Sequence, residues 1–169
     1  AGICTKPSGQ TYHVPDPNVH AMTLREPIGV VGMIVAWNFP ISLAMWKLAP
    51  ALAAGNTIVL KPASATPLSA IKLFELMEQV GFPKGVVNLV LGGGSDVGDE
   101  LAKNDEVDKI AFTGSIEAGQ SVMRAAAENV KGICLELGGK SPIVVFEDAD
   151  FDTAVDYAAF GMFYNQGEV

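Results

Sequence analysis

The feature that most constrains the fold of this chain is the alternation of short apolar segments with segments of helical pattern between residues 30 and 136. Short, nearly continuous apolar segments are typical of strands buried on both faces of a parallel sheet. Gly55 and Gly81 stand where two of the helices should end. This alternation predicts an α/β fold, a doubly wound parallel sheet. The expected strands are 30–36, 57–61, 86–91, 109–112 and 133–136, and the expected helices are 42–54, 67–80, 96–104 and 116–129.

The two ends of the chain have a different pattern. Residues 1–28 contain two short alternating stretches, 10–14 and 19–25, on either side of a Pro/Asn/Asp-rich turn, which predicts a β-hairpin. After Gly138 and Gly139, a sixth strand is expected at 142–146 and a helix from Asp150 onward.

Composition and charge exclude several function classes. The chain carries 19 acidic residues against 11 Lys and Arg, a net charge of −8, without a basic cluster, so nucleic acid is not an expected partner. The longest apolar run, 28–37, is far shorter than the ~20 residues of a membrane span. Cys4 and Cys134 lie far apart without metal-binding spacing, so no disulfide framework and no metal site is predicted. A soluble protein of the reducing cytoplasm fits this pattern.

Chemistry is expected where the strands end, because ligands of parallel sheets bind outside the carboxyl ends of the strands. The sequence AWNFP follows the first strand and places Asn38 there. Its carboxamide could donate to a ligand oxygen or to a developing oxyanion. Alternatively, Asn38 caps the next helix, with Trp37 and Phe39 in the core. Spacing alone does not decide between them.

Lys61, in KPAS after the second strand, has two readings as well. A lysine that closes a buried strand needs water or a polar ligand, so the ribose or phosphate of a cofactor is one partner. The other reading is a side chain that reaches solvent at the rim of the sheet.

The glycine-rich segment GGGSDVG, residues 92–98, resembles a phosphate-binding turn, but its spacing is one residue longer than the dinucleotide fingerprint. After the fourth strand, FTGS places Gly114 and Ser115 at the start of a helix, either as an anion site or as an ordinary N-cap.

Glu136, in LELGGKSP, ends the fifth strand. A carboxylate at the end of a buried strand is paired in a salt bridge, solvated in a cleft, or held there as a general base. The GGKS in this segment is not a phosphate-binding P-loop, because Cys134 occupies the position of the required first glycine.

In this order and spacing, AWNFP, KPAS, FTGS, LELGGKSP and FYNQGEV resemble the aldehyde dehydrogenase superfamily over essentially the whole chain. The resemblance implies a Rossmann-like cofactor domain, NAD or NADP, and oxidation of an aldehyde through a thiohemiacetal and a thioester on a cysteine. Asn38 would donate to the thiohemiacetal oxygen, and Glu136 would activate the deacylating water. The implied cofactor-binding residues are Val35, Ala36, Trp37, Lys61, Ala63, Ser64, Gly94, Phe112, Thr113, Gly114, Ser115, Leu137 and Gly138.

The resemblance places the nucleophilic cysteine directly after Val169, so the chain is expected to be a fragment that is inactive by itself. Neither Cys4 nor Cys134 matches the catalytic position, and Cys134 is expected to be buried and unreactive. A core left open at both ends would expose apolar patches, so we expect the isolated chain to be poorly soluble or dependent on partners. The rival hypothesis is a non-catalytic nucleotide-binding module or assembly element.

The resemblance also implies the domain organisation and leaves the cofactor open. Residues 1–28 would be an oligomerisation (bridging) hairpin, 29–138 most of the cofactor domain, and 139–169 the start of a second α/β domain, the catalytic one. The full-length protein would be a homodimer or homotetramer. Ala36 replaces a frequent proline, and Ser64 replaces the glutamate of many NAD-preferring members. NADP is therefore allowed, and NAD is not excluded.

Overall fold

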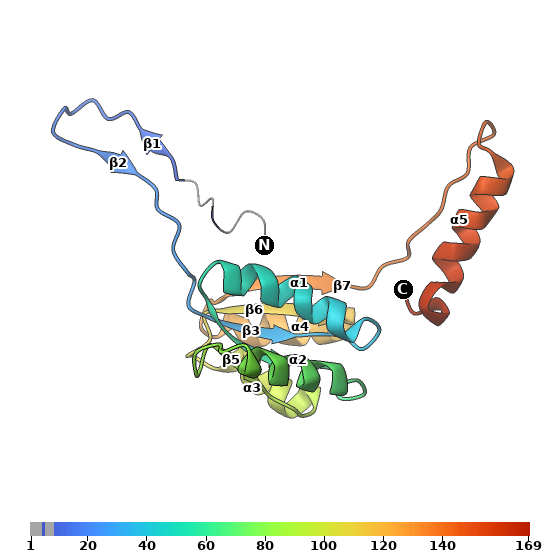
Figure 1. Cartoon of the computed structure of the whole chain (residues 1–169). Coiled ribbons are helices and arrows are strands. Elements are labelled where there is room, and N and C mark those ends of the chain that lie inside the picture. The colour runs from blue at the N-terminus through green and yellow to red at the C-terminus, as the bar shows by residue number, and fades with distance from the viewer. Residues whose placement is uncertain (1–4, 6–8) are drawn as a thin grey trace.

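The five-stranded parallel sheet at the centre of the molecule is the element that positions everything else (Figure 1). A computed structural model describes residue 5 and residues 9–169. The chain enters the sheet at the central strand, adds two strands on one side, and then crosses back to add two on the other, in the order β5-β4-β3-β6-β7. This arrangement confirms the predicted doubly wound fold. The strands are β3 (Val30–Ile34), β4 (Thr57–Lys61), β5 (Val87–Leu89), β6 (Lys109–Gly114) and β7 (Gly132–Leu137).

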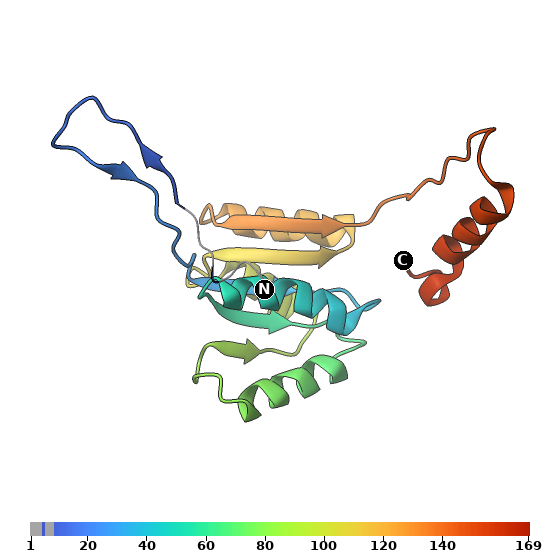
Figure 2. The ribbon, with the colours of Figure 1, turned by 45° about the horizontal axis from the view of Figure 1, so that its top comes forward.

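Helices cover both faces of this sheet, as Figures 1 and 2 show. On one face lie α1 (Pro40–Ala53) and α2 (Leu68–Gln79), and on the other lie α3 (Asp99–Lys103) and α4 (Ile116–Ala127). Gly55 and Gly81 adopt left-handed φ angles of 83° and 86° directly after α1 and α2, which confirms that they end these helices.

The core consists of two apolar layers, one on each face of the sheet. Leu48 of α1 packs with Met33, Ile58 and Leu60 in the first layer, and all four side chains are almost completely buried. In the second layer, Ile110 packs with residues of α3 and α4. Strands that face a helix layer on each side need apolar residues at successive positions, which explains their continuous apolar sequence.

Asn56 links the start of the sheet to the end of α1. It is buried, and its Oδ1 accepts from the backbone N–H groups of Ile28 (2.7 Å) and Gly29 (3.1 Å). Its Nδ2 donates to the carbonyl of Ala51 at 3.0 Å. The side chain therefore satisfies three backbone groups that would otherwise lack partners.

The hairpin and the C-terminal arm project from opposite ends of the sheet (Figure 2). The hairpin pairs β1 (Thr11–Tyr12) with β2 (Ala21–Met22) antiparallel, so the prediction is confirmed with shorter strands. We call residues 139–169 the C-terminal arm. It runs through an extended segment into α5 (Phe151–Phe163) and the short helical turn Tyr164–Gly167.

The sixth strand expected at 142–146 is wrong. The segment is extended, but no strand of the described part of the chain lies beside it, and its apolar side chains are exposed. Strand propensity alone does not form a strand, because the backbone groups also need a paired partner. The helix expected from Asp150 is confirmed, with the Asp150 carboxylate accepting from the Thr153 N–H at 2.8 Å as its N-cap. No helix in the described part of the chain is long and apolar enough to cross a membrane.

Candidate functional site

The candidate site lies along one edge of the sheet. All five strands are parallel, so their carboxyl ends meet at the same edge (Figure 1). Register places Lys61 beside Ile34 and Glu136 beside Thr113 at this edge. Residues from five separate segments of the sequence are therefore brought to one edge, as the sequence predicts.

Asn38 lies in the turn between β3 and α1. Val35 is buried and extends the pairing of β3, since its N–H donates to the Lys61 carbonyl at 3.2 Å. Ala36 is half-buried and Trp37 is 49% exposed. The residue that caps α1 is Phe39, without a side-chain hydrogen bond, so the alternative of Asn38 as an N-cap is wrong. Its Nδ2 instead donates to the backbone carbonyl of Glu168 at 2.6 Å.

Lys61 is buried at the end of β4, with 4% of its surface exposed. The alternative of a side chain that reaches solvent is therefore wrong. Its Nζ donates to the Pro62 carbonyl at 3.1 Å, and an ammonium group has three N–H donors. Burial lowers the pKa of Lys61, while the negative charge of Asp96 acts in the opposite direction. The ammonium is thus desolvated and has donor capacity left for a ligand.

The glycine-rich segment after β5 forms a π-helical turn, Gly94–Gly98, that runs directly into α3. The Ser64 hydroxyl donates to the Gly92 carbonyl at 2.9 Å, which ties the end of β4 to this turn. A Cβ at Gly98 would lie 3.6 Å from Cε of Lys61, so the turn passes close to the buried lysine. Of the other two predicted residues in these segments, Ala63 is half-buried and Gly94 is exposed.

The end of β6 is built around the ring of Phe112, which is buried. A Cβ at Gly114 would lie 2.6 Å from Cζ of this ring, so only glycine fits there. The Ser115 hydroxyl oxygen accepts from the Ala118 N–H at 3.2 Å, so Ser115 is the N-cap of α4. The Thr113 hydroxyl is buried and finds no partner among the described residues. A buried hydroxyl without a partner at the site edge is a group that a ligand can satisfy.

The surroundings of Glu136 differ from those expected of a strand buried on both faces, because β7 is an edge strand with one open face. Glu136 and Cys134 point to that face and are exposed, so the expected burial of this strand and of Cys134 is wrong. Glu136 forms no salt bridge with any residue that the structure describes, which excludes that alternative within this part of the chain. Leu137 packs on the opposite face against α4, and Gly138 has open space around it. Cys4 lies outside the described residues.

Lys47 of α1 is a residue that the strand-end patterns did not indicate. It is half-buried, and burial lowers its pKa, while the charges of Cys134 and Glu136 act in the opposite direction. The signal in the sequence is its spacing, three and four residues after the buried Ala44 and Leu43. A lysine on the apolar stripe of a helix is directed toward the sheet, here toward its open face beside β7.

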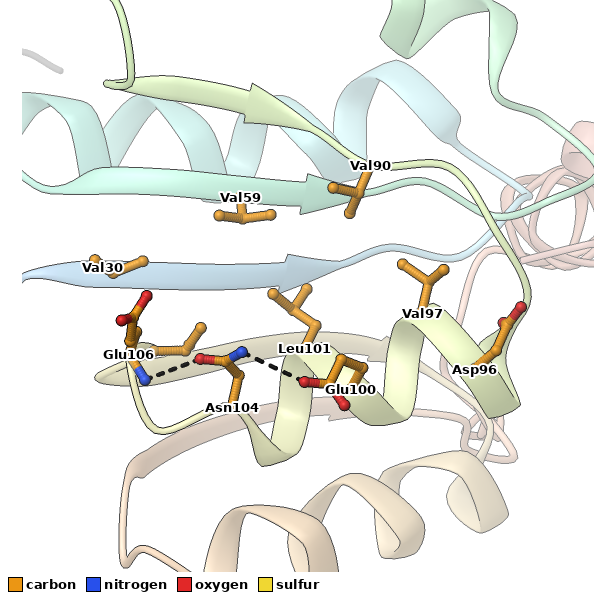
Figure 3. Close-up of a pocket in the computed structure, with 10 residues that line it drawn as sticks. Val30, Val59, Val90, Asp96, Val97, Glu100, Leu101, Asn104 and Glu106 are labelled. Carbon is orange, nitrogen blue, oxygen red and sulfur yellow. Dashed lines mark hydrogen bonds between the residues drawn. The ribbon is translucent and has the colours of Figure 1, made fainter.

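A separate pocket of about 550 Å³ lies between the sheet and α3 (Figure 3). None of the predicted site residues lines it. Asp96 stands at the end of this pocket toward which the strands point, near the site edge (Figure 3). The pocket is lined by Val30, Val59, Val90, Asp96, Val97, Glu100, Leu101, Asn104, Glu106 and Val107.

Comparison with known protein families identifies the family to which this chain belongs. The model of the aldehyde dehydrogenase family matches residues 1–169. The chain belongs to the aldehyde dehydrogenase family. The resemblance inferred from the strand-end motifs is thereby confirmed.

Similar proteins include curated enzymes and solved structures. Betaine aldehyde dehydrogenase of Bacillus subtilis is 57% identical over 169 residues, which is all of this chain and 34% of the relative. A solved betaine aldehyde dehydrogenase of Staphylococcus aureus in complex with NAD+ is 51% identical with a TM-score of 0.92, covering 95% of this chain and 32% of that one. A mutant aldehyde dehydrogenase of Bacillus cereus has 47% identity and a TM-score of 0.96, with 99% and 34% covered. The chain spans about a third of the length of these relatives.

Proposed function

We propose that the full-length protein carrying this chain oxidises an aldehyde to a carboxylic acid with a nicotinamide cofactor, and that this chain supplies the cofactor-binding edge. The observation that carries the proposal is the assembly of Asn38, Lys61, Ser115 and Glu136 at the carboxyl ends of one parallel sheet in a member of this family. A single edge then serves both cofactor binding and the reaction.

The residues present fit such a cofactor. Lys61 is desolvated and has unused donors, the Thr113 hydroxyl lacks a partner among the described residues, and Gly138 leaves open space. When bound, the nicotinamide supplies the acceptor for a hydride. We assign cofactor binding to Val35, Ala36, Trp37, Lys61, Ala63, Ser64, Gly94, Phe112, Thr113, Gly114, Ser115, Leu137 and Gly138.

Charge near Lys61 favours NAD over NADP. The Ser64 hydroxyl is engaged with the Gly92 carbonyl, and the Asp96 carboxylate acts on Lys61 from the neighbouring turn. A carboxylate near the ribose site repels a 2′-phosphate, so Asp96 takes over the charge that the glutamate at position 64 provides in other members. The solved relative in complex with NAD+ supports NAD as a cofactor.

Asn38 and Glu136 are the catalytic groups we assign to this chain. A carboxamide has two N–H donors, and Glu168 uses one of those of Asn38, so the second is available to a developing oxyanion. Glu136 is exposed on the open face of β7, where its carboxylate can take a proton from water. We propose that the nucleophilic cysteine follows directly after Val169 and lies beyond this chain.

We also propose the domain organisation implied by the family. Residues 1–28 form a bridging hairpin, 29–138 most of the cofactor domain, and 139–169 the beginning of the catalytic domain of a homodimer or homotetramer. The exposed free thiol of Cys134 supports a cytoplasmic, reducing location.

The test of function uses the full-length protein, NAD and a panel of aldehydes that includes betaine aldehyde. We expect NADH formation, measured by absorbance, and a loss of about 100-fold or more in kcat for the Asn38→Ala variant, since removing one oxyanion donor costs about that much. A full-length protein that binds NAD but oxidises none of the aldehydes would instead favour a non-catalytic nucleotide-binding module.

The test of the cofactor edge uses calorimetric titration of NAD and NADP into the 169-residue chain. Lys61→Ala should weaken NAD binding by about tenfold or more, because a charge-assisted hydrogen bond is lost. The matched control is Lys72→Ala, on the exposed face of α2, where Lys72 pairs with Glu75. Equal affinity in both variants would exclude Lys61 from the site.

A further inference from the structure

The last residues of the chain form a left-handed turn. Asn165 has φ 48° and ψ 45°, Gln166 has φ 60° and ψ 22°, and Gly167 has φ 80°. The turn is closed by the Glu168 N–H, which donates to the Asn165 carbonyl at 3.1 Å. Residues other than glycine are strained in this region, asparagine less than most, and two in succession persist only where neighbouring groups hold them.

A pair of reciprocal hydrogen bonds holds this turn against Asn38. The Asn165 side chain donates through Nδ2 to the Asn38 backbone carbonyl at 2.8 Å. In return, the Asn38 side chain donates through Nδ2 to the Glu168 carbonyl at 2.6 Å. The Tyr164 ring stacks on the Phe39 ring, with centroids 6.0 Å apart. These contacts join residues about 130 positions apart, in an arm whose helix α5 has no buried residue.

The direction of the free N–H of Asn38 depends on this pair. A carboxamide is planar, so once one N–H of its NH2 group is fixed by an acceptor, the other N–H points in a fixed direction in the same plane. The Glu168 carbonyl fixes the first N–H, and the Asn165 bond holds both the Asn38 backbone and the turn that presents this carbonyl. An oxyanion donor acts most strongly when it is oriented before the reaction begins.

We propose that Asn165 is a positioning residue, which orients the Asn38 carboxamide toward the substrate oxygen by clamping the left-handed turn onto the Asn38 backbone. The proposal rests on the role of Asn38 proposed above. Asparagine suits position 165 for two reasons. It tolerates the left-handed region of backbone conformation, and its side chain carries the N–H that reaches Asn38.

Three substitutions separate these two properties. Asn165→Gly keeps the left-handed backbone accessible and removes the donor. Asn165→Asp keeps the size and shape of the side chain and replaces the donor by an acceptor. Gln166→Gly is the matched control, since it relieves backbone strain one residue further on, and the Gln166 side chain forms no hydrogen bond to Asn38 among the described residues.

The kinetic test uses the full-length protein. We expect Asn165→Gly and Asn165→Asp to lower kcat by about 10-fold or more, short of the loss from deleting the Asn38 donor itself, with KM for NAD unchanged. Gln166→Gly should change kcat by less than about twofold. In an Asn38→Ala background, Asn165→Gly should cause almost no further loss, because a residue that acts through Asn38 has nothing left to orient. If the losses in kcat of the two single variants multiplied in the double variant, the proposal would be overturned.

A second measurement does not depend on catalytic activity. It tests the clamp, by which we mean the two hydrogen bonds that join Asn38 to Asn165 and Glu168. In the 169-residue chain, hydrogen exchange of the Asn38 carboxamide, followed by NMR, should be slow in the wild type and in Gln166→Gly and at least tenfold faster in Asn165→Gly. Equal exchange in wild type and Asn165→Gly would overturn the clamp. A slow wild-type rate combined with no aldehyde oxidation by the full-length protein would leave the clamp standing and reject the proposed function instead.

Discussion

The sheet with its helices and the C-terminal arm are both rich in apolar residues, but only the first buries them. Leu60 and Ile58 are completely buried between sheet and helices, whereas Phe160 and Met162 of α5 are 62% and 67% exposed. The arm has the apolar sequence of a core element without the facing surface that a core requires. Apolar composition therefore predicts that a segment can be buried, and the partner surface decides whether it is.

The order in each region has a correspondingly different source. In the sheet it comes from packing on both faces. In the arm it comes from a few individual contacts, namely the Asp150 cap, the hydrogen bonds between the terminal turn and Asn38, and the stacking of Tyr164 on Phe39. The arm should thus be sensitive to changes of these individual groups and insensitive to loss of the exposed apolar side chains of α5.

The largest difference is expected from a pair of truncations. Leu60→Ala should lower the free energy of unfolding by about 2–5 kcal/mol, because it leaves a cavity between α1 and the sheet. Phe160→Ala should change it by less than about 0.5 kcal/mol, since no buried contact is lost. Urea unfolding followed by circular dichroism measures both. Similar losses in the two variants would mean that the arm is packed after all.

A smaller loss is expected where a buried polar group joins the hairpin segment to the sheet. Asn56→Ala should cost about 2–3 kcal/mol in the free energy of unfolding, because three backbone groups lose their partner. Asn88→Ala is the comparison variant, since Asn88 lies half-buried at the edge strand and donates to the carbonyls of Ile58 and Gly85. It should cost about half as much. A larger cost for Asn88 in urea unfolding would contradict the ranking by burial.

Removal of the arm should have little effect on the sheet. A chain ending at Gly138 should keep its free energy of unfolding within about 1 kcal/mol, because α5 contributes no buried residue. It should also associate less than the 169-residue chain in sedimentation velocity, since exposed apolar patches promote association. Unfolding of the shortened chain would show that the sheet depends on the arm.

The smallest effect concerns pH and is confined to the arm. The hydrogen bond from Thr153 lowers the pKa of Asp150 below its ordinary value of 3.8. A carboxylate with a lowered pKa stabilises the folded form above its ordinary pKa, and this contribution is lost as the pH falls through the lowered value. The amide shift of Thr153, followed by NMR, should therefore change only below pH 3.8. Asp150→Asn, which keeps a capping acceptor, should remove the change.

The sequence predicts the sheet well because burial on both faces leaves a signal within each strand. The apolar run of β4, for example, is sufficient to place it, and Gly55 marks the end of the preceding helix. The motifs at the strand ends also predict which residues share the site edge, since parallel strands end at the same side.

The remaining features depend on positions that local patterns do not specify. The exposure of Cys134 and Glu136 follows from the place of β7 at the edge of the sheet, which the sequence of β7 does not encode. The hydrogen bond between Asn38 and Glu168 joins residues 130 positions apart. The strand expected at 142–146 failed for the same reason, because β-branched residues indicate propensity and pairing requires a neighbour.

The register of β7 against β6 decides which side chain stands at the site edge. Glu136 faces the open side of the sheet because β7 alternates, with Leu135 and Leu137 packed toward α4. A slip of β7 by one residue would turn Glu136 into the apolar layer and a leucine toward the site. A slip of two residues would restore the face but displace the carboxylate by about 6.6 Å along the strand. The two leucines on the far side of the strand therefore set both the face and the height at which the Glu136 carboxylate is presented.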